Sequence, residues 1–385
     1  MRIFVSAKTI NWAIEVTGQG EDIWQRIAKR LQKESKPEWV KIFKTKGQSL
    51  TLRQVEIIAK VLGIPPMFLT LPTPPSIDVS LPMFRKGKKP LSFYSKLTIG
   101  DAFEKSSWMA ERRQYFEQSP TYIVGILKEE KEIDAVVQYI EEELGISYKD
   151  NISSMVKKLE RFGVLVMRRR RFRNTRIKLS PEEFRGFAIA DKWAPVIFIN
   201  ASDAYVAQRF TVVHELVHIL LGKSGVSPYV DNILAEHEDM SNMVSENILV
   251  PISENKRLRN LRSLVDIVEY ARKKYVSPGV VIHVLWHRGF ITQSKAKRLF
   301  SQYKRQWIEG FQDDYTQRIE QKSSPKVRYI VRLRVENSYS LTNAVLLDVY
   351  SGRISEHDAS RLIHLSPDKV SHYAKIAYEE MLSSV

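Results

Sequence analysis

The stretch RFTVVHELVHILLG, residues 209–222, places three ionisable side chains inside an otherwise apolar run. Two of them, His214 and His218, are four positions apart, and Glu215 directly follows the first. The length and apolar character of the run predict a buried helix, in which leucine would be expected at these positions. Because buried polar groups are costly unless they have partners, this segment constrains the surrounding fold more than any other part of the chain.

Helical spacing brings these three side chains together. An α-helix repeats every 3.6 residues, so His214 and His218 lie one turn apart on one face, where two imidazoles can bind one metal ion. Glu215 lies beside that face and can reach a water molecule on the metal. In zincins, which share this pattern, zinc lowers the pKa of the bound water and the glutamate accepts its proton. The alternative is a chance match in a core helix, and with eight histidines in the chain about 0.01 such matches are expected at random.

A catalytic zinc site also needs a third protein ligand. The chain has no cysteine, so that ligand must be a histidine or a carboxylate. The segment ILAEHEDMSNMVSENILVP, residues 233–251, offers several candidates. If residues 235–249 form one helix, Glu238 and Asn242 share a face, which predicts Glu238 as the ligand and Asn242 as a residue that orients a histidine ligand. His237 is the alternative third ligand.

The first part of the chain predicts a domain of short helices over residues 1–75. The apolar spacing resembles a helix-turn-helix core, with one helix at about 23–31 and the next at about 36–43. A further helix is expected to begin at Ser49 or Thr51 as N-cap and to stop at Gly63 and Pro65. The residues expected to face inward are Ile23, Ile27, Ala28, Leu31, Trp39, Val40 and Phe43. A helical docking domain that binds no DNA is the alternative.

A proline-rich linker at residues 76–92 marks the clearest boundary, and residues 93–310 are predicted to form the domain that holds the metal site. Short apolar runs at 164–167, 184–190 and 194–200 predict strands of a small sheet. The arginine run that follows the first of these strands could bind phosphate groups. Because a hairpin splays neighbouring side chains to opposite faces, we favour a solvated hairpin for these residues. The run consists of Arg168, Arg169, Arg170, Arg171 and Arg173.

Residues 311–385 are predicted to form a small C-terminal extension. The alternating segment KVRYIVRLRVE, residues 326–336, reads as a strand, and two helices are expected around Ser366 and Pro367. Upstream, Ser277 and Pro278 predict a helix start, and that helix carries His283 and His287, again four positions apart. No acid stands next to these two histidines in the sequence, so packing is favoured over a second metal site there.

The chain carries a formal net charge of +16, from 60 Lys and Arg against 44 Asp and Glu. Such an excess suits an acidic partner such as double-stranded DNA, although it can also simply keep a protein soluble. The sequence has no stretch approaching roughly 18 uninterrupted apolar residues, and its start, MRIFVSAKTINW, lacks the pattern of a signal peptide. We therefore expect a cytoplasmic protein with no membrane partner.

Several segments together resemble the ImmA/IrrE family of zinc metallopeptidases. The region before the linker is similar to the Xre-type helix-turn-helix domain that many members carry in front of the peptidase. The resemblance covers about residues 1–300. The segments that carry the peptidase resemblance are, in order, FRGFAIA, IFINASD, RFTVVHELVHILLG and EDMSNMVSENILVP.

This resemblance implies both a fold and an activity. It implies a gluzincin-like domain with His214, His218 and Glu238 as zinc ligands and Glu215 as the general base. The predicted fold class is therefore α+β, mostly α, with an N-terminal helix-turn-helix bundle, a zincin-like domain with a small sheet, and a helical C-terminal region. Better-known relatives cleave or relieve DNA-binding repressors, so a zinc endopeptidase acting on a transcriptional repressor is expected. The alternative is a DNA-binding regulator or toxin–antitoxin partner whose peptidase domain is a sensor or scaffold.

Overall fold

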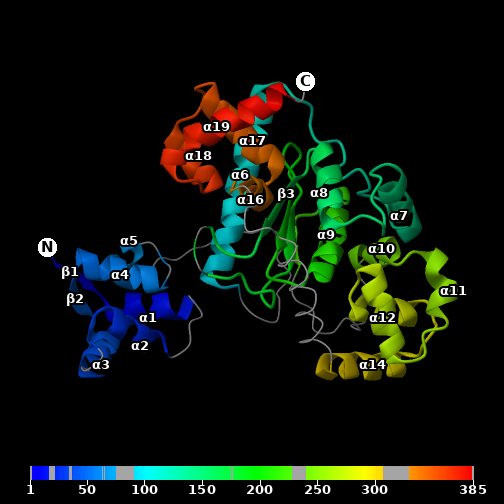
Figure 1. The fold of residues 1–385 in the computed structure, drawn as a ribbon, viewed down its shortest axis with the longest axis horizontal. Coiled ribbons are helices and arrows are strands. Elements are labelled where there is room, and N and C mark those ends of the chain that lie inside the picture. The colour runs from blue at the N-terminus through cyan, green and yellow to red at the C-terminus, as the bar shows by residue number, and fades with distance from the viewer. Residues whose placement is uncertain are drawn as a thin grey trace. The chain divides into compact units, whose positions relative to one another are not determined.

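The structure is a computed structural model, and the residues it describes are mostly helical with two small sheets (Figure 1). This confirms the α+β, mostly α fold class. None of the helices in the described part of the chain has the length and apolar content that a membrane span requires. The described residues are 2–16, 22–33, 37–62, 64, 66–74, 91–173, 175, 177–227, 240–306 and 329–383.

The chain divides into two compact units, each described by itself below. The domain boundaries predicted at residues 75, 92 and 310 stay predictions. The first unit consists of Met1–Ser80, Pro90–Gly100 and Arg171–Leu179, and the second of Leu81–Lys89, Asp101–Arg170 and Ser180–Val385.

The first unit contains short helices and a two-stranded antiparallel sheet. This sheet was not predicted, because two strands of four residues give little alternation to detect. Gly47 precedes the second strand with φ +84°, and a Cβ there would lie 2.5 Å from the carbonyl oxygen of Val5, so the turn requires glycine. The elements are β1 (Arg2–Val5), α1 (Ala7–Val16), α2 (Ile23–Arg30), α3 (Pro37–Lys46), β2 (Gln48–Thr51), α4 (Leu52–Leu62) and α5 (Pro66–Leu69).

The helix pair α2–α3 and its successor α4 lie where the sequence predicts helices. Phe43 of α3 is fully buried, whereas Trp39 and Val40, also expected to face inward, are only half-buried. Thr51 rather than Ser49 caps α4, because its hydroxyl accepts a hydrogen bond from the Gln54 amide at 3.3 Å. The stop signals predicted at residues 63 and 65 lie outside the described residues.

The second unit is built around a four-stranded mixed sheet in the order β3-β5-β4-β6. β3 is parallel to β5, and the other neighbours are antiparallel. Every residue of β4 and β5 is buried, which fits a sheet covered on both faces. The three predicted strands are confirmed. The strands are β3 (Leu165–Arg169), β4 (Gly186–Ile189), β5 (Val196–Asn200) and β6 (Gly225–Ser227).

Helices pack against both sides of this sheet (Figure 1). The predicted metal helix α9 packs on β4 and β5, and α10 packs on α9, while α16 and α17 pack against β3. The helices are α6 (Phe93–Tyr115), which begins in the first unit, α7 (Ile133–Glu142), α8 (Ile152–Arg161), α9 (Tyr205–Leu220), α10 (Met240–Leu249), α11 (Asn255–Leu258), α12 (Leu264–Lys274), α13 (Pro278–His287), α14 (Gln293–Gln306), α16 (Tyr329–Asn337), α17 (Tyr339–Tyr350), α18 (Glu356–Ile363) and α19 (Pro367–Leu382).

The prediction of a strand at residues 326–336 is wrong, because Tyr329–Asn337 is helix α16. Its buried residues, Ile330, Leu333 and Asn337, are three and four positions apart, which is the helical repeat. Alternating apolar and arginine residues satisfied the strand pattern equally well. The two helices predicted around Ser366 are confirmed as α18 and α19.

The arginine run is solvated only in part. Arg170, Arg171 and Arg173 are exposed, as predicted, but Arg169 on β3 is only 2% exposed, so the solvated interpretation is wrong for that residue. Its guanidinium donates to Asp101 Oδ2 at 2.6 Å, and it also donates to the Glu336 carbonyl at the end of α16. The sequence pattern missed this because the acid lies 68 positions away.

Asp101 is the centre of a buried ion cluster that joins α6, β3 and α18. Lys105 Nζ donates to its carboxylate at 2.5 Å, and His364 Nε2 lies 2.8 Å from the other oxygen. Burial alone would raise the pKa of Asp101, but the charges of Lys105 and Arg169 hold it well below its usual range. Burial and the Lys105 charge lower the pKa of His364 to about 3, so that imidazole is neutral.

Replacing the central acid should destabilise the second unit strongly. Asp101→Asn leaves two buried cations without their counter-ion, and breaking a buried pair in this way costs about 3–5 kcal/mol. Denaturant unfolding followed by circular dichroism measures the change. Glu111→Gln, an exposed acid on the same helix, is the control and should change stability by about 0.5 kcal/mol or less. Equal stability of the two variants would contradict the importance of the cluster.

Candidate metal centres

Helix α9 is held at both ends by polar contacts. Near its beginning, Arg209 is 2% exposed and donates to the carbonyls of Tyr148, Lys274 and Tyr275. Near its end, the Gly125 amide donates to the Ile219 carbonyl at 2.9 Å. These contacts fix the direction of the helix and therefore the positions of the side chains it carries.

The two histidines of α9 face each other through their Nε2 atoms. His214 Nε2 and His218 Nε2 are 3.3 Å apart, and both side chains are half-buried. Two nitrogens bound at 2.0–2.1 Å to one tetrahedral zinc ion would be separated by about 3.3 Å. The pair therefore fits a shared metal ion, although its role as ligand stays a prediction.

Glu215 is fully buried beside strand β4. The closest approach is at Gly186, where a Cβ would lie 2.9 Å from Glu215 Oε1 and 2.4 Å from the Thr211 methyl carbon. The Thr211 hydroxyl donates to the Ala207 carbonyl, which fixes the orientation of that methyl group. Only glycine leaves room for the carboxylate at this point of the strand.

The remaining predicted site residues lie on or before α10. Asn242 is on α10 and is half-buried. Glu238, the predicted third ligand, and His237, its alternative, lie outside the described residues. Their roles stay predictions.

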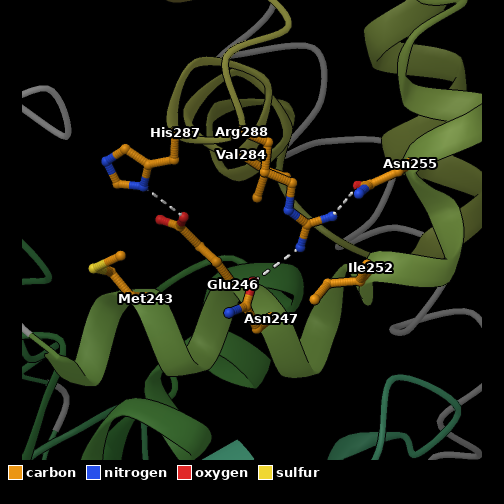
Figure 2. Close-up of a pocket in the computed structure, with 8 residues that line it drawn as sticks. All are labelled: Met243, Glu246, Asn247, Ile252, Asn255, Val284, His287 and Arg288. Atoms are coloured by element: carbon orange, nitrogen blue, oxygen red, sulfur yellow. Dashed lines mark hydrogen bonds and ion pairs between the residues drawn. The ribbon is translucent and has the colours of Figure 1, made fainter. Parts of the chain in front are cut away.

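A second cluster of potential metal ligands, Glu246, His283 and His287, joins α10 to α13. Figure 2 shows two of its members, Glu246 and His287. Glu246 Oε1 contacts His283 Nδ1 in a very short hydrogen bond, and Glu246 Oε2 lies 3.1 Å from His287 Nδ1. One ligand atom from each residue can be chosen so that all three lie within 4.8 Å of one another. Packing was favoured for the two histidines because no acid stands next to them in the sequence. The acid comes instead from α10, 37 positions before His283.

This cluster is buried but borders a cavity. Glu246 and His283 are each 4% exposed, and His287 lies at the cavity wall. Burial raises the pKa of Glu246, but its hydrogen bonds to the two imidazoles outweigh that effect and lower it. The cavity has a volume of about 240 Å³ and is lined by Met243, Glu246, Asn247, Ile252, Asn255, Val284, His287 and Arg288.

The middle of the chain matches a known family. Residues 159–280 match the peptidase M78 family, described as the IrrE N-terminal-like domain, and this match supports the ImmA/IrrE family. It covers about a third of the chain, includes all of α9 and α10, and suggests a metallopeptidase. No curated protein and no solved structure matches the chain.

Adding a methyl group at Gly186 tests the close approach of α9 to β4. Gly186→Ala should lower the melting temperature, because overpacking of this kind costs about 1–3 kcal/mol. Gly100→Ala is the matched control: no atom lies within 4 Å of its added Cβ, and alanine in a helix is about 0.5–1 kcal/mol better than glycine. The melting temperatures of the two variants, measured by thermal unfolding, should therefore shift in opposite directions from that of the wild type. A stabilised Gly186→Ala protein would contradict the close approach of α9 to β4.

Proposed function

We propose that this protein is a zinc endopeptidase with a zincin-like (gluzincin) domain, in which His214, His218 and Glu238 hold the zinc ion. The observation that carries the proposal is the 3.3 Å separation of the two Nε2 atoms on a buried helix, with a buried glutamate between them in the sequence. The family match over residues 159–280 supports the same class of enzyme.

The polar residues His214, Glu215 and His218 of α9 each have a proposed part in peptide hydrolysis. When bound, zinc supplies a Lewis acid that polarises the substrate carbonyl and makes water acidic near neutral pH. Glu215 accepts the proton of the attacking water at a carboxylate oxygen and can return it to the leaving amine. The packing of Gly186 and Thr211 restricts the side chain of Glu215, so its carboxylate is held in place before substrate binds. Asn242 is proposed to orient one of the histidine ligands.

The proposed substrate is a DNA-binding transcriptional repressor. The N-terminal unit, with helices α2, α3 and α4 in the order expected of a helix-turn-helix domain, is proposed to recruit double-stranded DNA or that repressor. The net charge of +16 supports an acidic partner. In the alternative function, the protein is a DNA-binding regulator or toxin–antitoxin partner, and its peptidase domain acts as a sensor or scaffold.

Loss of a ligand should remove the proposed catalytic zinc. His218→Ala and Glu238→Ala should each contain one zinc ion per chain less than the wild type, because a site with two protein ligands holds zinc weakly. Elemental analysis of the purified full chain measures the content. A full zinc content in either variant would contradict the ligand set. If Glu238→Ala keeps its zinc and His237→Ala loses it, His237 is the third ligand instead.

Removing the proton acceptor should abolish cleavage without removing zinc. Glu215→Gln is nearly isosteric and alters no proposed ligand, so the zinc content should match the wild type while the cleavage rate falls by about 10²–10⁴-fold or more. Co-expression with a candidate repressor, followed by mass measurement of that repressor, gives the readout. Glu129→Gln, an exposed acid, is the control and should cleave normally. If Glu215→Gln and the wild type remove the repressor equally, hydrolysis is not the function, and the alternative applies.

A further inference from the structure

Glu246, His283 and His287 form a cluster that the proposed peptidase chemistry does not use. The acid is on α10 and the two imidazoles are one turn apart on α13, so the three groups meet only because these helices are neighbours in the fold. Among the described residues that could hold a metal ion together, this group of three includes neither histidine of α9. The group therefore shares no residue with the α9 histidine pair.

The cluster places one buried carboxylate between two imidazoles. Glu246 has a lowered pKa and is ionised at neutral pH, and it is buried against two imidazoles. Arg288 lies in the cavity wall, and its guanidinium donates to Asn247 Oδ1 and Asn255 Oδ1 (Figure 2). It also donates to the Val250 carbonyl. Both oxygens of the carboxylate are instead directed to the histidines. Buried charges are normally paired or coordinate metals, and here the groups around the carboxylate are metal ligands themselves.

The arrangement of atoms also suits an ion. Both Nδ1 atoms face the carboxylate, and the Nδ1–Oε2 distance at His287 is 3.1 Å, close to the ligand separation in a tetrahedral site. Within the described part of the chain, His283 Nε2 is buried and has no hydrogen-bond partner, so the polar pairing of that ring is through Nδ1 alone. The adjoining cavity of about 240 Å³ has room for water to complete the coordination.

We propose that Glu246, His283 and His287 form a second site for a divalent transition-metal ion such as Zn²⁺, separate from the α9 histidine pair. The ion takes Nδ1 of each histidine and one carboxylate oxygen, and any proton held between these atoms is released to solvent on binding. Two imidazoles and a carboxylate are a ligand set of intermediate softness, which selects zinc and its neighbours over Mg²⁺ or Ca²⁺.

The expected role of this ion is structural. It connects α10 to α13, and α10 also packs against α9, so the ion fixes the helix that lies between the two histidine pairs. Structural zinc sites contribute folding energy directly. Zinc should therefore raise the melting temperature even in a protein that lacks the α9 histidines.

The experiment uses the full chain carrying His214→Ala and His218→Ala, so that zinc at the α9 pair cannot contribute. After chelation and dialysis against Zn²⁺, elemental analysis should find one zinc ion per chain, and Zn²⁺ should raise the melting temperature. Adding either His287→Ala or Glu246→Gln to this background should abolish both effects. His357→Ala, which removes an exposed histidine elsewhere, is the control and should leave both effects intact.

Circular dichroism establishes that each variant is folded, and the nearly isosteric Glu246→Gln keeps the test valid if His287→Ala unfolds. Absence of stoichiometric zinc in the background protein would overturn the proposal, as would zinc that persists in both added variants. The zinc content also distinguishes this outcome from a failure of the proposed peptidase site. If the α9 histidines bind no zinc, the wild type contains no more zinc than the background protein.

Discussion

The contact between helix α9 and strand β4 is the constraint on which the second unit depends. Because Gly186 has no side chain, the Thr211 methyl and the Glu215 carboxylate lie closer to strand β4 than any other residue at position 186 would allow. The helix is fixed along its length by the three carbonyls that Arg209 contacts and by the amide of Gly125. A buried carboxylate held in this way loses little freedom when substrate binds, so the packing that stabilises the fold also preorganises the proposed proton acceptor.

The parts of this fold that could be predicted are those with a local signal. The apolar frame of α9, the runs that became β4 and β5, and the Ser277 start of α13 each depend on residues within one element. The failures involve distant partners. Arg169 is buried because Asp101 and Glu336 meet it from other elements, and no local pattern distinguishes it from the exposed Arg170. Glu246 was missed as the partner of His283 and His287 for the same reason, since the acid and the histidines come from different helices.

Helix α10 connects the two candidate metal centres. Its residues Ser241 and Ser245 are buried on one face, whereas Glu246, one position further, is directed towards α13. Successive residues of a helix differ by about 100° in direction, so a single helix can serve two neighbours with different chemistry. The predicted third ligand, Glu238, precedes this helix by two positions, so the placement of α10 bears directly on the proposed catalytic site.

The two buried polar clusters of the second unit are completed in different ways. Asp101 is surrounded by Lys105 and Arg169, both within 2.6 Å, so the chain itself supplies more than enough positive charge to neutralise the acid. Among the described residues, the hydrogen-bond partners of the Glu246 carboxylate are the two imidazoles, and the guanidinium of the nearby Arg288 donates to amide and carbonyl oxygens. The first cluster needs nothing from solution. The second brings two imidazole nitrogens and one carboxylate together, which is the set of ligand atoms on which the proposed second metal site is based.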